Sequence, residues 1–420
     1  MTTTTTLALL GGEPTVTADG PHFEWPPMDD ATEQKVLAQL RTAISVPDRS
    51  GIVAEFEDAL QDYFHVRHAV TFSSGTSALH AAYFGAGIVP GDEVIVPAWT
   101  FHATASPMFH LGAVPVLCET GPDGNIDPAR VEELITPRTR ALMVTHLWGR
   151  PAAMPTLRRI TDTHGMALLE DGSHAHGATH SGRKVGTFGL AGAFSLNGPK
   201  PLSGGEGGFV LTDDDTTYYR LLTFAHYNRR AKSEIPESHP LALYTTTGAG
   251  LKLRIHPLAA ALAHDQLGHL DARLAGRAEI ARYLMAEFAD IPGLDVIPMP
   301  DGVIPSWYGL TLAYRPDELG GLNIERFHQA LLAEGATEFD RPGSTCPMNL
   351  LPLYQNPTLL FPGNSYGRSH YQTGDFPVAE LAHAHTIKLP VWHREQDLPL
   401  AAGYVRAAAK VSAHHKELLT

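Results

Sequence analysis

Residues 53–87 read VAEFEDALQDYFHVRHAVTFSSGTSALHAAYFGAG and join three patterns in one short stretch. Residues 53–64 place their apolar side chains at helical spacing. HAVTFSS (68–74) is a short apolar run typical of a buried strand, and TSALHAAYFGAG (76–87) is again helical. This order of helix, strand and helix is typical of a chain that builds an α/β sheet.

The same alternation continues outward, from about residue 50 to residue 212. Gly and Pro clusters separate the apolar runs and mark turns between them. Strands are predicted at 93–99, 114–120, 141–148, 167–171, 192–196 and 207–212, and further helices at 104–113 and 154–165. Alternating strands and helices predict an α/β fold around a mostly parallel sheet.

The pattern changes after about residue 213. Helices are predicted at 216–226 and 256–289, and the second is so long that we expect a break near Gly268. A second α/β segment has strands at 294–299 and 306–315, a loop-rich stretch at 342–364, and helices at 323–335, 377–387 and 401–419. We expect an N-terminal arm (1–24), a large domain (25–270) and a smaller C-terminal α/β domain (271–420).

The composition is that of a folded, acidic protein. Its 420 residues are 43% hydrophobic and 18% charged, which suits roughly two to three domains of about 150 residues each. Lys and Arg number 31 against 45 Asp and Glu, a formal net charge of −14. Because nucleic acids and anionic membranes are bound through excess positive charge, this balance argues against both kinds of partner.

Cysteine and histidine give no pattern for a disulfide framework or a metal site. Cys118 and Cys346 are the only two cysteines, and the 23 histidines are scattered without a metal-binding helical pair. We therefore expect no metal, and two reduced thiols in a cytoplasmic protein. MTTTTTLALLGG (1–12) lacks the basic segment of a secretory signal, and no apolar window is long enough to span a membrane.

SSGTSALHAA (73–82) is a candidate anion site. Gly75 allows a tight turn after the predicted strand, and Thr76 and Ser77 open the following helix. The free backbone N–H groups and the dipole of such a helix start favour a phosphate group. An ordinary helix cap by Ser or Thr gives the same pattern, and taken alone it is the more common explanation.

ALLEDGSHAHGA (167–178) delivers Asp171 at the carboxyl end of a predicted strand. Ligands of open α/β sheets bind at that edge, and a carboxylate there can pair with a protonated ring nitrogen. A solvated Asp at the end of a strand is an equally good interpretation of this stretch alone.

GAFSLNGPKPLSGGEGGFVLT (192–212) contains Lys200 between two prolines, one of only eight lysines in the chain. The prolines fix the backbone and prevent a helix. Such a stiff mount is unusual for a solubilising lysine and suits one that must reach a cofactor carbonyl as a nucleophile. Further along, Lys252 and Arg254 precede the strongly helical run.

These stretches occur in a set order together with several others. The others are GGEP (11–14), GDEVIVPAWTFHAT (91–104), NIDPARVEELITPRTRALMVTHLWGRP (125–151), GEGGFVLT (205–212) and the helical DQL (265–267). Over nearly its whole length the sequence resembles the DegT/DnrJ/EryC1/StrS family of sugar and cyclitol aminotransferases. Members of that family use pyridoxal phosphate (PLP) on the aspartate-aminotransferase type of fold, fold type I.

The resemblance implies a role for each matching residue. Lys200 matches the lysine that holds PLP covalently, and Asp171 the aspartate that pairs with the pyridine nitrogen. His174 matches a Gln or His position beside the ring, and Phe101 the aromatic residue that stacks on it. The phosphate-binding positions of the family match Gly75, Thr76 and Ser195.

One position departs from the family's pattern. Many members carry an Asn in a GxNxR motif that reaches the cofactor phosphate of the neighbouring subunit, whereas GLKLR (250–254) has Lys252 there. A lysine can donate to phosphate as a point charge, so we expect a homodimer in which Lys252 binds PLP. Some members replace the PLP lysine by His and are dehydratases; Lys200 argues against that branch.

The resemblance thus implies a PLP-dependent aminotransferase that moves an amino group from glutamine or glutamate to a keto-cyclitol or keto-sugar, in antibiotic biosynthesis of the aminoglycoside kind. The alternative is a PLP-dependent lyase or dehydratase of the same fold. A regulatory protein with an inactive PLP site is disfavoured because Lys200 and Asp171 are both present. A nicotinamide enzyme is the least favoured, since no GxGxxG follows the first strand.

Overall fold

The centre of the protein is a seven-stranded sheet, seen in a computed structural model that describes residues 6–363 and 370–419. Residues 1–5 of the predicted arm and Asn364 of the predicted loop stretch lie outside the described residues. From one edge to the other the strands are β1 (His68–Phe72), β10 (Gly208–Thr212), β9 (Ala191–Ser195), β6 (Ala167–Asp171), β5 (Thr139–Thr145), β2 (Glu93–Pro97) and β4 (Val114–Cys118).

The sheet is mostly parallel, which confirms the fold class predicted from sequence. Only β10 runs against its neighbours, pairing antiparallel with both β1 and β9. Because β1 and β9 are both antiparallel to β10, they run parallel to each other. The carboxyl ends of β1, β9 and β6 therefore meet at one edge of the sheet.

Alternation along the strands covers both faces of this sheet with apolar side chains. On one face, residues such as Val210 and Met143 pack against α3 (Gly75–Gly85) and α7 (Asp215–Ala225). On the other face, Phe209 packs under α2 (Gly51–Phe64) and α9 (Pro257–Phe288), and Leu142 under α6 (Met154–His164). A sheet buried on both faces leaves its edge as the place for a site.

A smaller unit at the carboxyl end has its own core. Its strands are β11 (Leu294–Val296), β13 (Leu310–Tyr314) and β15 (Thr386–Leu389), in the order β11-β13-β15. They pack with α10 (Ile324–Ala333), α14 (Leu398–Ala413) and the carboxyl-terminal half of α9. Residues 386–387 were predicted to be helical but lie in β15, since they complete this sheet beside β13.

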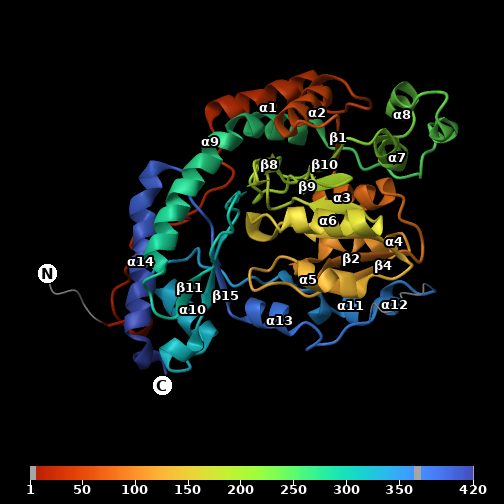
Figure 1. The fold of residues 1–420 in the computed structure, drawn as a ribbon. Helices are drawn as coiled ribbons and strands as arrows, with labels where there is room; N and C mark the ends of the chain where they lie inside the picture. Colours follow the sequence, from red (N-terminus) through yellow and green to blue (C-terminus); the bar gives the residue numbers. More distant parts are fainter. Residues whose placement is uncertain (1–5, 364–369, 420) are drawn as a thin grey trace.

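The long helix α9 connects the two cores, and the predicted break near Gly268 is wrong. The helix is continuous over its 32 residues and runs from α1 (Asp30–Thr42) and α2 to α14 (Figure 1). Gly268 is exposed and costs roughly 1 kcal/mol relative to Ala, which packing along both cores outweighs. The boundary predicted at residue 270 falls inside this helix and stays a prediction.

The stretch predicted to be loop-rich contains short elements and packs on the large sheet's core. It contains β14 (Thr345–Pro347), α11 (Pro352–Gln355) and α12 (Pro357–Leu360), and α13 (Pro377–Ala384) follows. Strand β14 pairs antiparallel with β3 (Trp99–Phe101), and Met348 and Tyr354 join the core around α3. A segment late in the sequence thus reaches the sheet edge where the strands end.

The remaining elements are short. The helix predicted at 104–113 is reduced to α4 (Pro107–His110) and the 3-10 turn η2 (His102–Thr104). The other short elements are α5 (Pro128–Val131), α8 (Arg229–Glu234), β7 (Thr179–His180), β8 (Arg183–Lys184), β12 (Val303–Ile304), η1 (Ala8–Leu10), η3 (Glu132–Leu134), η4 (Leu147–Gly149), η5 (Pro240–Tyr244), η6 (Pro316–Leu319), η7 (Met348–Leu350), η8 (Glu395–Asp397) and η9 (His415–Leu418).

Candidate active site

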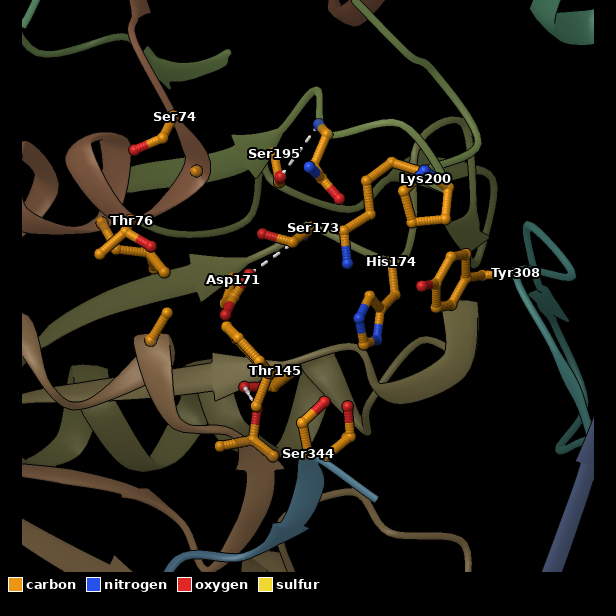
Figure 2. Close-up of a pocket in the computed structure, with 18 of the residues that line it drawn as sticks. Ser74, Thr76, Thr145, Asp171, Ser173, His174, Ser195, Lys200, Tyr308 and Ser344 are labelled. Atoms are coloured by element: carbon orange, nitrogen blue, oxygen red, sulfur yellow. Dashed lines mark hydrogen bonds between the residues drawn. The ribbon is translucent and has the colours of Figure 1, made fainter. Parts of the chain in front are cut away.

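A cavity of about 380 Å³ lies at the carboxyl edge of the sheet, beside the start of α3. Figure 2 shows side chains from separate parts of the chain around it, with Lys200 extending toward His174. Seven of the eight residues singled out from sequence line this cavity: Gly75, Thr76, Phe101, Asp171, His174, Ser195 and Lys200.

The start of α3 forms a cradle against the end of β9. Ser74 caps the helix, its Oγ accepting from the N–H of Ser77 at 3.0 Å. The helix therefore has an ordinary cap. Among the described residues, no protein group accepts a hydrogen bond from the backbone N–H of Gly75 or Thr76. A Cβ on Gly75 would lie 2.5 Å from the Cβ of Ser195, so only glycine lets the helix approach this close. The cradle suits a phosphate.

Asp171 ends β6, and its carboxylate is held from two sides. Its Oδ2 accepts a 2.7 Å hydrogen bond from the Thr104 hydroxyl, and its Oδ1 accepts one of 3.1 Å from the backbone N–H of Ser173. Thr104 Oγ1 is itself 2.7 Å from Thr100 Oγ1. Asp171 is only 4% exposed, so it is not the solvated strand-end residue that the sequence alone allowed.

Lys200 lies in the loop between β9 and β10. Its backbone N–H donates to the carbonyl of Asn197 at 2.9 Å, and its own carbonyl accepts from the indole N–H of Trp25 at 2.7 Å. Burial lowers the pKa of the Lys200 ammonium to about 8; Asp171 opposes this shift and Lys388 adds to it. About a tenth of this amine is therefore neutral, and nucleophilic, at pH 7, far more than of an amine with the ordinary pKa of 10.5.

His174 stands in a stack of three rings beside the cavity. Its ring centroid is 4.4 Å from that of Tyr308 and 5.5 Å from that of Trp148, with the planes nearly parallel. The Nδ1 of His174 accepts from the backbone N–H of Trp148 at 3.3 Å. Burial, with the charges of Lys200 and Lys388, holds the pKa of His174 well below its usual value. The ring is therefore neutral, and because Nδ1 accepts a hydrogen bond, the ring proton is on Nε2.

Phe101 ends β3 and lines the same cavity. The strand is fixed by β14, in which Thr345 is the register partner of Phe101. The side chain is 37% exposed, unusual for an aromatic residue at the end of a buried strand. An exposed ring face at the rim is available to stack on a planar ligand.

Lys252 lies outside this cavity. It is exposed, with its Nζ 5.8 Å from the ring centroid of Tyr227. It precedes α9, which begins at Pro257, as the sequence predicted. The next residue, Leu253, accepts through its carbonyl from the N–H of Ser73 at 2.7 Å. The predicted contact of Lys252 with a neighbouring subunit's cofactor stays a prediction.

Several lining residues carried no signal in the sequence. Tyr308 precedes β13, while Ser344 and Thr345 belong to the stretch predicted as loop. These three reach the cavity only through pairing of distant segments, which a single sequence does not encode locally. Thr104, which holds Asp171 from behind the lining, was predicted only as part of a helix.

Two classes of feature are absent from the described residues. No group of three His, Cys, Asp or Glu side chains could hold a metal ion there. No helix in that part of the chain is long and apolar enough to cross a membrane.

The fold and the site together define a class of protein: an α/β enzyme of fold type I, whose sheet edge holds an anion cradle, a half-buried lysine and a strand-end carboxylate. The chain belongs to the DegT/DnrJ/EryC1/StrS aminotransferase family, whose sequence pattern matches residues 29–398. The protein is therefore an aminotransferase, which confirms the resemblance noted from its motifs.

Similar proteins come from biosynthetic pathways of bacteria. The L-glutamine:2-deoxy-scyllo-inosose aminotransferase of Streptomyces kanamyceticus is 37% identical over 338 residues, covering 79% of this chain and 78% of that protein. The dTDP-3-amino-3,4,6-trideoxy-alpha-D-glucose transaminase of Streptomyces venezuelae is 36% identical over 293 residues, covering 69% and 73%.

Solved structures agree with this placement. S. venezuelae DesV, in complex with a ketimine intermediate, superposes with a TM-score of 0.73 at 30% identity and covers 90% of this chain and 94% of that one. The structure of 3-amino-5-hydroxybenzoic acid synthase superposes with a TM-score of 0.76 at 25% identity, covering 93% and 98%.

Proposed function

We propose that this aminotransferase uses PLP, held covalently by Lys200, to move an amino group from glutamine or glutamate to the keto group of a cyclitol or sugar. One observation carries the proposal. Lys200, Asp171 and the start of α3 face a single cavity, so amine, carboxylate and anion cradle can engage one cofactor molecule. When bound, PLP supplies an electron sink and a carrier for the amino group.

The residues of the cavity fit PLP in size and in charge. The gap between Gly75 and Ser195, with the N–H groups of Gly75 and Thr76, suits its phosphate. The Asp171 carboxylate would hold a proton on the ring nitrogen, as a buried anion favours a cation beside it. We assign Phe101 to the ring face and His174 to the ring's polar edge.

Lys200 would serve in two steps. Its neutral amine would hold the cofactor in the cavity through a covalent bond to the cofactor's carbonyl carbon, formed with loss of water. When an amino donor takes the place of Lys200, the freed amine would accept the proton of the donor's α-carbon and later give it back. A pKa of about 8 suits both roles, because the group can gain and lose a proton near neutral pH.

The charge of the cavity favours a keto-cyclitol as acceptor over a nucleotide-linked keto-sugar. Among the described residues, its charged lining groups are Asp171, Lys200 and Glu206. With Lys200 engaged by the cofactor, none of these remains as a cation for a diphosphate. The relative named for 2-deoxy-scyllo-inosose supports an uncharged cyclitol as acceptor. An acceptor of this kind suits the antibiotic biosynthesis that the sequence predicted.

Assembly and location complete the proposal. We infer a homodimer whose two sites lie at the interface, with Lys252 of each subunit reaching the other's cofactor phosphate. The exposure of Lys252 and its place beside the residues that lead into the cradle support this assignment. Two buried, unpaired thiols support a cytoplasmic location.

The test is a pair of coupled measurements on the PLP-loaded protein. Release of the 2-oxo acid from glutamine and from glutamate identifies the donor, and amination is then scored on keto-cyclitols and on nucleotide keto-sugars. We expect turnover with a keto-cyclitol. Turnover only with nucleotide keto-sugars would overturn the choice of acceptor, and elimination or aldol cleavage without amine transfer would overturn the function.

A further inference from the structure

Trp25 makes a hydrogen bond directly to the backbone of the proposed catalytic lysine. Its indole Nε1–H donates to the carbonyl oxygen of Lys200 at 2.7 Å, although the two residues are 175 positions apart in the sequence. Trp25 precedes α1 and is half-buried, far in sequence from every motif that suggested the site. An indole N–H is a donor only, so this bond has one direction.

The other hydrogen bonds of the loop that carries Lys200 are local. At its base the Gly204 N–H donates to the carbonyl of Leu196, the Leu196 N–H donates to that of Gly207, and the Lys200 N–H donates to that of Asn197. The flanking Pro199 and Pro201 have no N–H to contribute. Among the described residues, the hydrogen bond from Trp25 is the one that reaches residues 197–203 from another part of the chain.

The indole is itself fixed on the helix that joins the two cores. The guanidinium carbon of Arg277 lies 4.1 Å from the centre of the Trp25 ring, and Arg277 is 2% exposed. His393 packs edge-on against the same ring at 5.6 Å, and Phe23 stacks on it at 6.1 Å. A ring held from three directions is a firm anchor for the bond that it donates.

We propose that Trp25 is a positioning residue that fixes the backbone of Lys200 and so keeps its amine inside the cavity. The inference rests on the proposed function for the identity of Lys200 as the reactive group. Without the indole bond the Lys200 carbonyl would turn to water, and no hydrogen bond from another part of the described chain would fix the backbone at Lys200. The amine would then be better hydrated and its placement less exact.

The variant Trp25→Phe tests this, because it removes the N–H donor and keeps a smaller aromatic ring on Arg277. The readout is the pKa of Lys200 in the full-length protein freed of cofactor, from competitive labelling with acetic anhydride and mass spectrometry. We expect the pKa to move from about 8 toward the ordinary value of 10.5. Asp171, Lys388, His174 and Tyr308, which face the amine, are unchanged in this variant.

Trp392→Phe is the matched control. The indole of Trp392 also donates to a carbonyl at 2.7 Å, that of His22 in the same N-terminal segment. We expect it to lower Tm and leave the Lys200 pKa in place. An unchanged Lys200 pKa in Trp25→Phe, or an equal shift in both variants, overturns the positioning role.

Steady-state kinetics give a second readout. Trp25→Phe should lower kcat about tenfold and leave KM for the amino donor nearly unchanged, since the misplaced group acts in the chemical step. A raised KM with unchanged kcat would contradict the role. The labelling experiment needs neither cofactor nor substrate, so failure of the proposed function would not imitate failure of this inference.

Discussion

The hydroxyl of Thr104 lies 2.7 Å from Oδ2 of Asp171 and donates to it, with both side chains buried. A hydrogen bond to a buried carboxylate is stronger than one between neutral groups, and it fixes the direction in which the remaining lone pairs point. The second oxygen is fixed by the N–H of Ser173. Asp171 is thus oriented before any ligand arrives.

Replacing Thr104 by Val should weaken the site without changing its shape. The substitution leaves the Asp171 carboxylate with one donor fewer, and we expect the free energy of unfolding to fall by about 1–3 kcal/mol. Turnover should fall as well, by about tenfold, because the carboxylate loses its fixed orientation. Urea unfolding and kcat measure the two effects.

Thr161→Val is the control for that experiment. Thr161 is a buried threonine of α6 whose hydroxyl donates to the carbonyl of Arg158 at 2.8 Å, away from the cavity. It should lose stability and keep its kcat. A Thr104→Val protein with normal kcat would show that this hydroxyl only stabilises the fold.

Lys200→Ala should abolish both turnover and covalent capture of PLP. The variant lacks the nucleophile and the proton carrier together, so we expect a loss of more than about 10³-fold in kcat. Borohydride reduction followed by mass spectrometry should find no labelled peptide. Lys184→Ala, whose lysine lies over the Tyr63 ring, should label normally. PLP trapped on another lysine in Lys200→Ala would show that the site is assigned to the wrong residue.

The rate of PLP capture by the cofactor-free protein should depend on pH through Lys200. Burial lowers the pKa of this amine to about 8, so below that pH most of it is protonated and unreactive. The rate constant should rise about tenfold per pH unit up to this point and level off above it, because only the neutral amine attacks. Stopped-flow absorbance measures it.

Nα-acetyl-lysine amide in solution, whose only amine is the ε-amine, provides the reference curve for that measurement. This amine is unburied, so its rate should keep rising up to the ordinary pKa of 10.5. If the protein followed the same curve, Lys200 would have no depressed pKa and burial would not activate it.

Gly75→Ala should close the phosphate cradle. The new Cβ would lie 2.5 Å from the Cβ of Ser195 and 2.9 Å from its Oγ, so the helix start must move away from β9. We expect PLP to bind at least about tenfold more weakly, since the N–H groups lose their placement. Fluorescence titration with PLP measures this.

Gly268→Ala is the matched change in α9, where nothing lies within 4 Å, and it should raise stability by about 1 kcal/mol. Unchanged PLP affinity in Gly75→Ala would remove the cradle from the site.

Local patterns were enough to predict the parts of the site that lie in loops at strand ends. Gly75, Asp171 and Lys200 each follow or end a short apolar strand, and parallel strands bring such positions to one edge. Phe101 and His174 came from the family resemblance, because neither has a spacing that marks it. The roles of all these residues, like that of Lys252, stay predictions.

The rest depended on packing between distant segments. Trp25 lies before α9 in the sequence and Tyr308 lies after it, and both reach the site. No local motif predicts that they meet there. The antiparallel direction of β10 follows from its return beside β9 after the loop at 196–207, a geometry that apolar runs do not specify. The break predicted at Gly268 is wrong, because packing of α9 against the two cores stabilises the helix by more than an exposed glycine destabilises it.

Lys252→Ala tests both the shared site and the assembly. If Lys252 reaches the phosphate of a second subunit's cofactor, its removal takes away one positive charge, and PLP should bind about tenfold more weakly with the fold intact. Lys232→Ala, which removes an exposed lysine of α8, should leave PLP affinity unchanged.

Sedimentation of the unaltered protein should give a dimer. Unchanged affinity in Lys252→Ala would discard the phosphate role. An active monomer would discard the shared site altogether, because the exposed Lys252 lies outside its own chain's cavity.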